Sequence, residues 1–119
     1  REFASTHASP ESRSRAAALH AAWFAREARI ATDALEGPAF DATCTWLVSV
    51  EPDLIVAEAY AMAFDPHLLA PLAVARAMID LVLSRVKQLA SRIPTVLARL
   101  PVGDPHTLSL IHISEPTRL

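Results

Sequence analysis

The stretch from residue 68 to residue 93 constrains the fold more than any other part of the chain. Its apolar side chains recur at alternating steps of four and three residues, the spacing that lines one face of an α-helix. We therefore predict a long central helix here. We expect its apolar seam to form either the core of the molecule or an interface with another copy. The seam consists of Leu68, Leu72, Ala75, Ile79, Val82, Val86, Leu89 and Ile93.

The two halves of this predicted helix differ on their remaining faces. Up to Leu83 the other faces are also apolar, and only Arg76 and Asp80 interrupt them. From Ser84 onward the outer face becomes polar. A helix that is apolar all round is stable only when it is enclosed. The pattern therefore predicts that the first half lies inside a bundle and the second half lies on its surface.

The composition favours helices and excludes several classes of function. Apolar residues make up 52% of the 119 residues, aromatic residues only 6%, and glycine occurs twice. Alanine therefore supplies much of the apolar content, which favours helices over strands. The formal net charge of −2, without a block of like charges, argues against nucleic-acid binding. Every window of about twenty residues carries charges, so we expect no membrane span. We expect a cytoplasmic location, since the single cysteine cannot form an internal disulfide.

A second helix is predicted near the N-terminus. Ser9-Pro10-Glu11 combines an N-cap residue, a proline at the first helical position and an acid in the first turn. We expect the helix to end near Glu36, since Gly37 is a natural terminator and Pro38 bars continuation. We expect its inner face to be formed by Ala16, Leu19, Trp23, Ile30 and Ala34.

The middle of the chain, residues 40 to 64, is ambiguous between helix and strand. Residues 43–50 are rich in β-branched side chains, but their neighbours look helical, so we favour a helix. The apolar run at 54–57 fits either a buried helix or a short buried strand. Farther on, Pro71 predicts a restart or a kink, and Pro94 predicts a bend near Ile93.

The ambiguous run also carries a family resemblance. Pro52-Asp53-Leu54-Ile55-Val56-Ala57, followed by Phe64-Asp65-Pro66, resembles a stretch of the siderophore-type periplasmic binding proteins. In that family a strand of this kind leads toward the ligand cleft. The resemblance implies an α/β fragment that binds a small molecule, with a buried strand at 54–57.

The two ends of the chain differ from its body. We expect residues 1–8 to be a disordered end, residues 9–101 a single helical domain and residues 102–119 an unstructured tail. The string SLIHISEPTR resembles translated sequencing-adapter read-through. We therefore expect residues 108–119 not to be native, and the chain to be a truncated piece of a larger bacterial protein.

No catalytic motif is present, and we expect no catalytic residue, cofactor or metal ion. His20 and Glu27 share a helix face, which we interpret as a polar edge. A lone Cys44 is typical of a small buried hydrophobe. Glu58 has apolar neighbours on both sides, so we expect it to form a buried ion pair with Arg76.

A short phrase at the end of the first predicted helix carries a second resemblance. Thr32-Asp33-Ala34-Leu35-Glu36-Gly37 resembles the inhibitory helix of Fic-type nucleotide transferases, in which the glutamate blocks the nucleotide site. The resemblance implies a regulatory helical segment of an enzyme whose catalytic motif lies outside this chain.

Taken together, these patterns predict an all-α fold, a small bundle of four or five helices around a long central helix. The function that they favour is a non-catalytic helical interaction or oligomerisation module, which forms a homodimer or binds a larger protein. The alternatives are the small-molecule-binding α/β fragment and the regulatory enzyme segment.

Overall fold

The structure is a computed structural model that describes residues 9–35, 37–105 and 107–114. Within them the chain forms six α-helices and one 3₁₀ turn, with no strand. The predicted all-α bundle is confirmed, and the alternative strand at 54–57 is wrong because those residues lie within a helix. The elements are α2 (Pro10–Ala34), α3 (Phe40–Ser49), α4 (Glu51–Phe64), η1 (Pro66–Leu68), α5 (Leu69–Val82), α6 (Val86–Arg99) and α7 (Thr107–Ser114).

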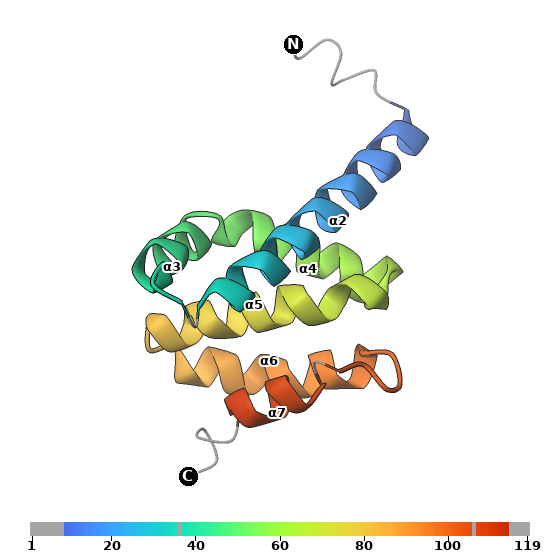
Figure 1. Ribbon diagram of the computed structural model, residues 1–119. Coiled ribbons are helices and arrows are strands. Elements are labelled where there is room, and N and C mark those ends of the chain that lie inside the picture. Colours follow the sequence, from blue (N-terminus) through green and yellow to red (C-terminus); the bar gives the residue numbers. More distant parts are fainter. Residues whose placement is uncertain (1–8, 36, 106, 115–119) are drawn as a thin grey trace.

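Helix α5 lies at the centre of the bundle. It packs against α2, α3 and α4 on one side and against α6 and α7 on the other (Figure 1). Ten of its residues are buried, and they include Leu72, Ala75 and Ile79 of the predicted seam. The predicted enclosure of the apolar first half is therefore confirmed as far as Asp80, whereas Leu81, Val82 and Leu83 at its end are exposed.

The prediction of one continuous helix over 68–93 is wrong, because the chain turns back at Leu83, Ser84 and Arg85. Ser84 adopts a left-handed conformation with φ of 58°. The backbone N–H of Arg85 donates to the carbonyl of Asp80 at 2.7 Å, and that of Ser84 donates to Leu81 at 3.2 Å. These are the two hydrogen bonds of a Schellman motif, which satisfies the last carbonyls of a helix. A serine thus fills the place that glycine usually takes.

Two members of the predicted seam flank this turn and face solvent. Val82 is 44% exposed and Val86 is 46% exposed. Beyond the turn, Leu89 and Ile93 are buried on the inner face of α6, where they pack back toward α5. The two seam segments therefore face each other across a helical hairpin.

The restart predicted at Pro71 is confirmed, because the single turn η1 precedes α5, whereas Pro94 does not divide α6. Pro71 lies in the first turn of α5, directly after η1, where a backbone N–H would have no helical partner in any case. Pro94 lies inside α6 on its exposed side, and α6 continues through it to Arg99.

The start of α2 matches its prediction, but its faces do not. Ser9 Oγ accepts a hydrogen bond from the backbone N–H of Ser12 at 3.0 Å, and Pro10 is the first helical residue. The buried face consists of Ala21, Ala25, Ala28 and Ala31. The residues that we expected on the inner face, Leu19, Trp23 and Ile30, are exposed instead.

The predicted unstructured tail is also wrong for part of its length. Residues Thr107–Ser114 form α7, which packs against α5 and α6, and Leu110 is fully buried. Within the described residues the bundle therefore has six helices, where we expected four or five. Residues 1–8 and 115–119, on which the other predictions for the ends fall, lie outside the described residues.

Candidate functional site

The most polar feature of the interior is a cluster of charges between α4, α5 and α6. Asp80 on α5 is almost completely buried. Arg85 donates to its Oδ1 from Nε at 3.0 Å, and Arg92 Nη2 contacts its Oδ2. Arg85 also reaches Glu51 on α4 through Nη2. One arginine at the α5–α6 turn therefore joins carboxylates of two helices.

The second part of the cluster is the predicted pair of Glu58 and Arg76. Arg76 Nη1 donates to Glu58 Oε1, and both side chains are largely buried. Glu58 Oε2 and Arg76 Nε are buried without a hydrogen-bond partner among the described residues. A buried pair with one unsatisfied atom on each side costs stability compared with a fully bonded pair.

The electrostatics of the cluster follow from its burial. Burial lowers the pKa of Arg92, and the nearby positive charge of Arg76 lowers it further, while the carboxylates of Glu58 and Glu51 raise it. Each of the three carboxylates has at least one arginine as partner. These ion pairs join α4, α5 and α6, and Glu58 Oε2 remains buried without a hydrogen bond among the described residues.

The two polar residues that the sequence placed on one face of α2, His20 and Glu27, each contact another charged side chain. His20 Nε2 lies 3.2 Å from Asp53 Oδ1 on α4, and its ring packs on Phe24 with centroids 4.8 Å apart. Glu27 does not join His20; its nearest charged partner is Arg26, at 3.9 Å. In the ranges that the structure describes, no group of three His, Cys, Asp or Glu side chains could hold a metal ion.

Cys44 lies at a shallow hollow of about 250 Å³ on the surface of α3. The other residues lining the hollow are Thr45, Val48 and Val82. None of them is a base that could activate a thiol. The hollow therefore offers no nucleophilic centre.

The phrase that resembles the Fic inhibitory helix has a local structural role. Thr32 Oγ1 donates to the carbonyls of Ala28 at 3.0 Å and Arg29 at 3.1 Å, one turn earlier in α2. The helix ends at Ala34. Glu36, the residue on which the resemblance depends, lies outside the described residues.

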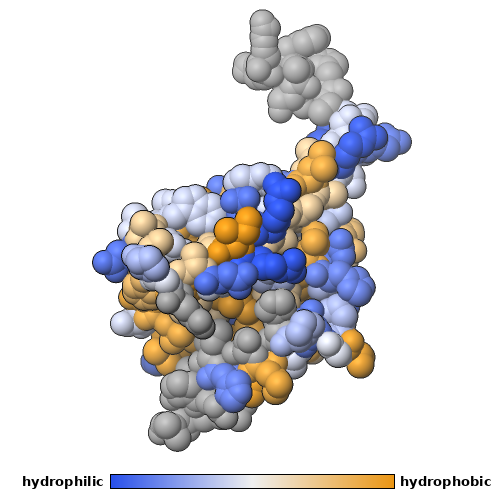
Figure 2. Space-filling view, viewed as in Figure 1, coloured by the Kyte–Doolittle hydropathy of each residue, from blue (hydrophilic) through white to orange (hydrophobic). Residues whose placement is uncertain are grey.

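The largest feature that the sequence analysis missed is the outer face of α2. Leu19 is 64% exposed, Trp23 46% and Ile30 57%. The three lie on the side of the helix opposite the four buried alanines, and Arg26 continues the row between Trp23 and Ile30. We call Leu19, Trp23, Arg26 and Ile30 the outer stripe. Figure 2 shows hydrophobic atoms at the surface along α2, set among strongly hydrophilic ones.

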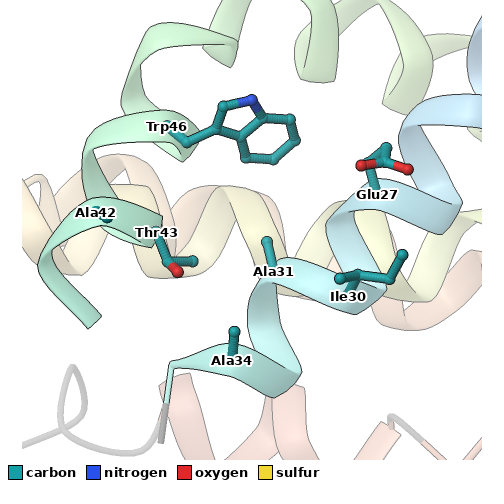
Figure 3. Close-up of a pocket in the computed structure, with 7 residues that line it drawn as sticks. All are labelled: Glu27, Ile30, Ala31, Ala34, Ala42, Thr43 and Trp46. Carbon is teal, nitrogen blue, oxygen red and sulfur yellow. The ribbon is translucent and has the colours of Figure 1, made fainter. Parts of the chain in front are cut away.

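A groove between α2 and α3 adjoins the outer stripe. It has a volume of about 260 Å³ and opens to solvent. Ile30 belongs to both the stripe and the groove, and Trp46 projects from α3 toward α2 across the opening (Figure 3). Glu27 and Thr43 are its only polar residues, so an apolar side chain fits it better than a polar ligand. The remaining lining residues are Ala31, Ala34 and Ala42.

Comparison of the chain with protein-family models, with curated proteins and with solved structures gave no match in any of the three. Among the helices that the structure describes, none combines the length and the apolar character needed to cross a membrane. Function therefore has to be argued from the surface features above.

Proposed function

We propose that this chain is a non-catalytic helical interaction module that binds another protein chain through the outer face of α2. The observation that carries the proposal is the orientation of this helix. It turns alanines toward the core and Leu19, Trp23 and Ile30 toward solvent. Isolated apolar residues are common on protein surfaces and need no explanation. A row of large ones on one helix face is a feature of interaction sites.

The spacing of the row supports the same conclusion. From Leu19 the outer stripe proceeds by steps of four, three and four residues through Trp23 and Arg26 to Ile30. This is the spacing of helices that pack side by side through interlocking side chains. Tryptophan and arginine are also the residue types that contribute most to binding energy in protein interfaces.

The groove beside the stripe supplies the second element of an interface. A partner helix lying along α2 would place side chains over Ile30, beside the opening that Trp46 and Ala34 line. Burying an apolar side chain in such a depression removes water from both surfaces. The buried charge cluster supports the non-catalytic part of the proposal, since its carboxylates are occupied by arginines.

Photo-cross-linking tests the proposal. A photoreactive amino acid replaces Leu19 in the full chain, and the same group at Ala59, an exposed position of α4, serves as the control. Both proteins are irradiated alone and in extract from the source of the gene. We expect adducts from position 19 that excess wild-type chain removes by competition and that a Trp23→Ser, Ile30→Ser competitor does not. Equal labelling from both positions, or none from position 19, would overturn the proposal.

A further inference from the structure

We infer that the outer stripe binds a second copy of this chain, with the two α2 helices antiparallel about a two-fold axis near residues 24 and 25. The inference rests on the proposed function and specifies the partner. It follows from the order of charged and apolar residues along α2 and from the side of the helix on which the bundle lies.

The antiparallel register pairs complementary side chains across the axis. It places Leu19 of one copy opposite Ile30 of the other, and Trp23 opposite Arg26. The first pair is apolar on both sides. In the second, a guanidinium meets the face of an indole, a cation–π contact. The Arg26 side chain is 67% exposed and its ion pair with Glu27 is long, at 3.9 Å, so the guanidinium can turn toward the indole.

Charge distinguishes this orientation from a parallel one. In a parallel pair each residue meets its own copy, so Arg26 would face Arg26 and Asp33 would face Asp33. Like charges in contact oppose association. In the antiparallel pair Arg15 and Ala16 of one copy lie beside Asp33 of the other, so opposite charges meet at each end. Arg15, Arg26 and Asp33 are all exposed.

The shape of the molecule accommodates this pairing. The outer stripe lies opposite the alanine face, so the two bundles would sit on the far sides of the helix pair and would not collide. The groove of about 260 Å³ beside Ile30 lies where Leu19 of the second copy would pack. Each copy therefore offers both an apolar side chain and the depression that receives it.

Disulfide trapping in a Cys44→Ser background tests the inference. Leu19→Cys and Ile30→Cys chains are oxidised separately and as a mixture. We expect the mixture to form at least about ten times more linked dimer than either chain alone, because like positions lie about 16 Å apart along the antiparallel axis, beyond the roughly 7 Å that a disulfide spans. Ala59→Cys is the control and should form no disulfide-linked dimer, and sedimentation of the wild-type chain should show a monomer–dimer equilibrium.

The outcomes separate this inference from the proposed function. Linked dimers of Leu19→Cys with itself would indicate parallel helices and overturn the inference. A wild-type chain that stays monomeric at all concentrations, while position 19 forms competed adducts with another protein, would overturn the inference and leave the proposed function standing. Absence of both dimers and adducts would overturn both.

Discussion

Helices α2 and α5 are both rich in apolar residues at steps of three and four, yet they relate to the core in opposite ways. In α5 nearly every face is buried, because five other helices and the turn η1 contact it. In α2 only the alanine face is buried, and the larger side chains Leu19, Trp23 and Ile30 are exposed. Periodicity therefore identifies a helix and its faces without showing which face is inside.

The size of the side chains explains the difference. Ala21, Ala25 and Ala28 allow the backbone of α2 to lie close to α4 and α5, since the distance between packed helices depends on the side chains at the contact. A leucine or tryptophan on that face would force the helices apart. Hydrophobicity favours Leu19 over alanine for burial, but close packing favours alanine.

The largest expected difference in the free energy of unfolding is between substitutions of a buried and an exposed isoleucine. Ile79→Asp should unfold the protein, because a buried charge without a partner costs several kcal/mol, comparable to the whole stability of a small domain. Ile30→Asp places the same charge on the outer stripe and should change the free energy of unfolding by less than about 0.5 kcal/mol. Urea unfolding followed by circular dichroism measures both. Comparable losses for the two variants would show that α2 does not expose this face.

The next prediction concerns the charges that hold α5 to α6. Asp80→Asn leaves Arg85 and Arg92 without their shared carboxylate and should cost about 3–5 kcal/mol. Asp53→Asn, which removes the exposed partner of His20, should cost at most about 1 kcal/mol. Thermal and urea unfolding compare the two. A mild effect of Asp80→Asn would mean that the cluster is solvated.

A third pair of variants tests how closely α2 packs against α4 and α5. Ala28→Leu adds apolar volume to the fully buried face and should destabilise the protein by about 1–3 kcal/mol. Ala22→Leu adds the same volume at an exposed position of the same helix and should be neutral within about 0.5 kcal/mol. If Ala28→Leu proved stabilising, the alanine face could not be closely packed.

The smallest expected effect concerns the turn that divides the apolar seam. Ser84→Gly should stabilise the protein by about 0.5–1 kcal/mol, because glycine adopts the left-handed conformation without steric cost. Ser91→Gly, inside α6, should instead destabilise by about 0.5–1 kcal/mol. A rise in the unfolding midpoint for the first variant and a fall for the second is the expected result. Destabilisation by Ser84→Gly would contradict the left-handed conformation of Ser84.

The sequence was sufficient to predict those features that depend on residue type and on spacing along the chain. The cap at Ser9, the enclosure of α5 and the pairing of Glu58 with Arg76 follow from residue types and spacing. The turn at Ser84 could not be foreseen, because no glycine or proline marks it and its conformation depends on the packing of α6 back onto α5. The burial of Leu110 depends on the same hairpin.

The candidate binding surface was missed for a related reason. We assigned the larger apolar residues of α2 to the core, although the alanines at 21, 25 and 28 repeat with the same steps of four and three. Two apolar faces on opposite sides of one helix were therefore visible in the sequence. Choosing between them requires knowing how closely the neighbouring helices approach.

The most direct test of the account is the fluorescence of Trp23 in a Trp46→Phe chain, followed as the protein is concentrated. The account predicts the emission of a solvent-exposed indole in dilute solution, and a shift to shorter wavelength as the dimer forms. Leu19→Ser in the same background should keep the emission of the dilute chain at every concentration. Emission typical of a buried indole even at the lowest concentration would contradict the exposed stripe, and emission that never shifts would contradict the pairing.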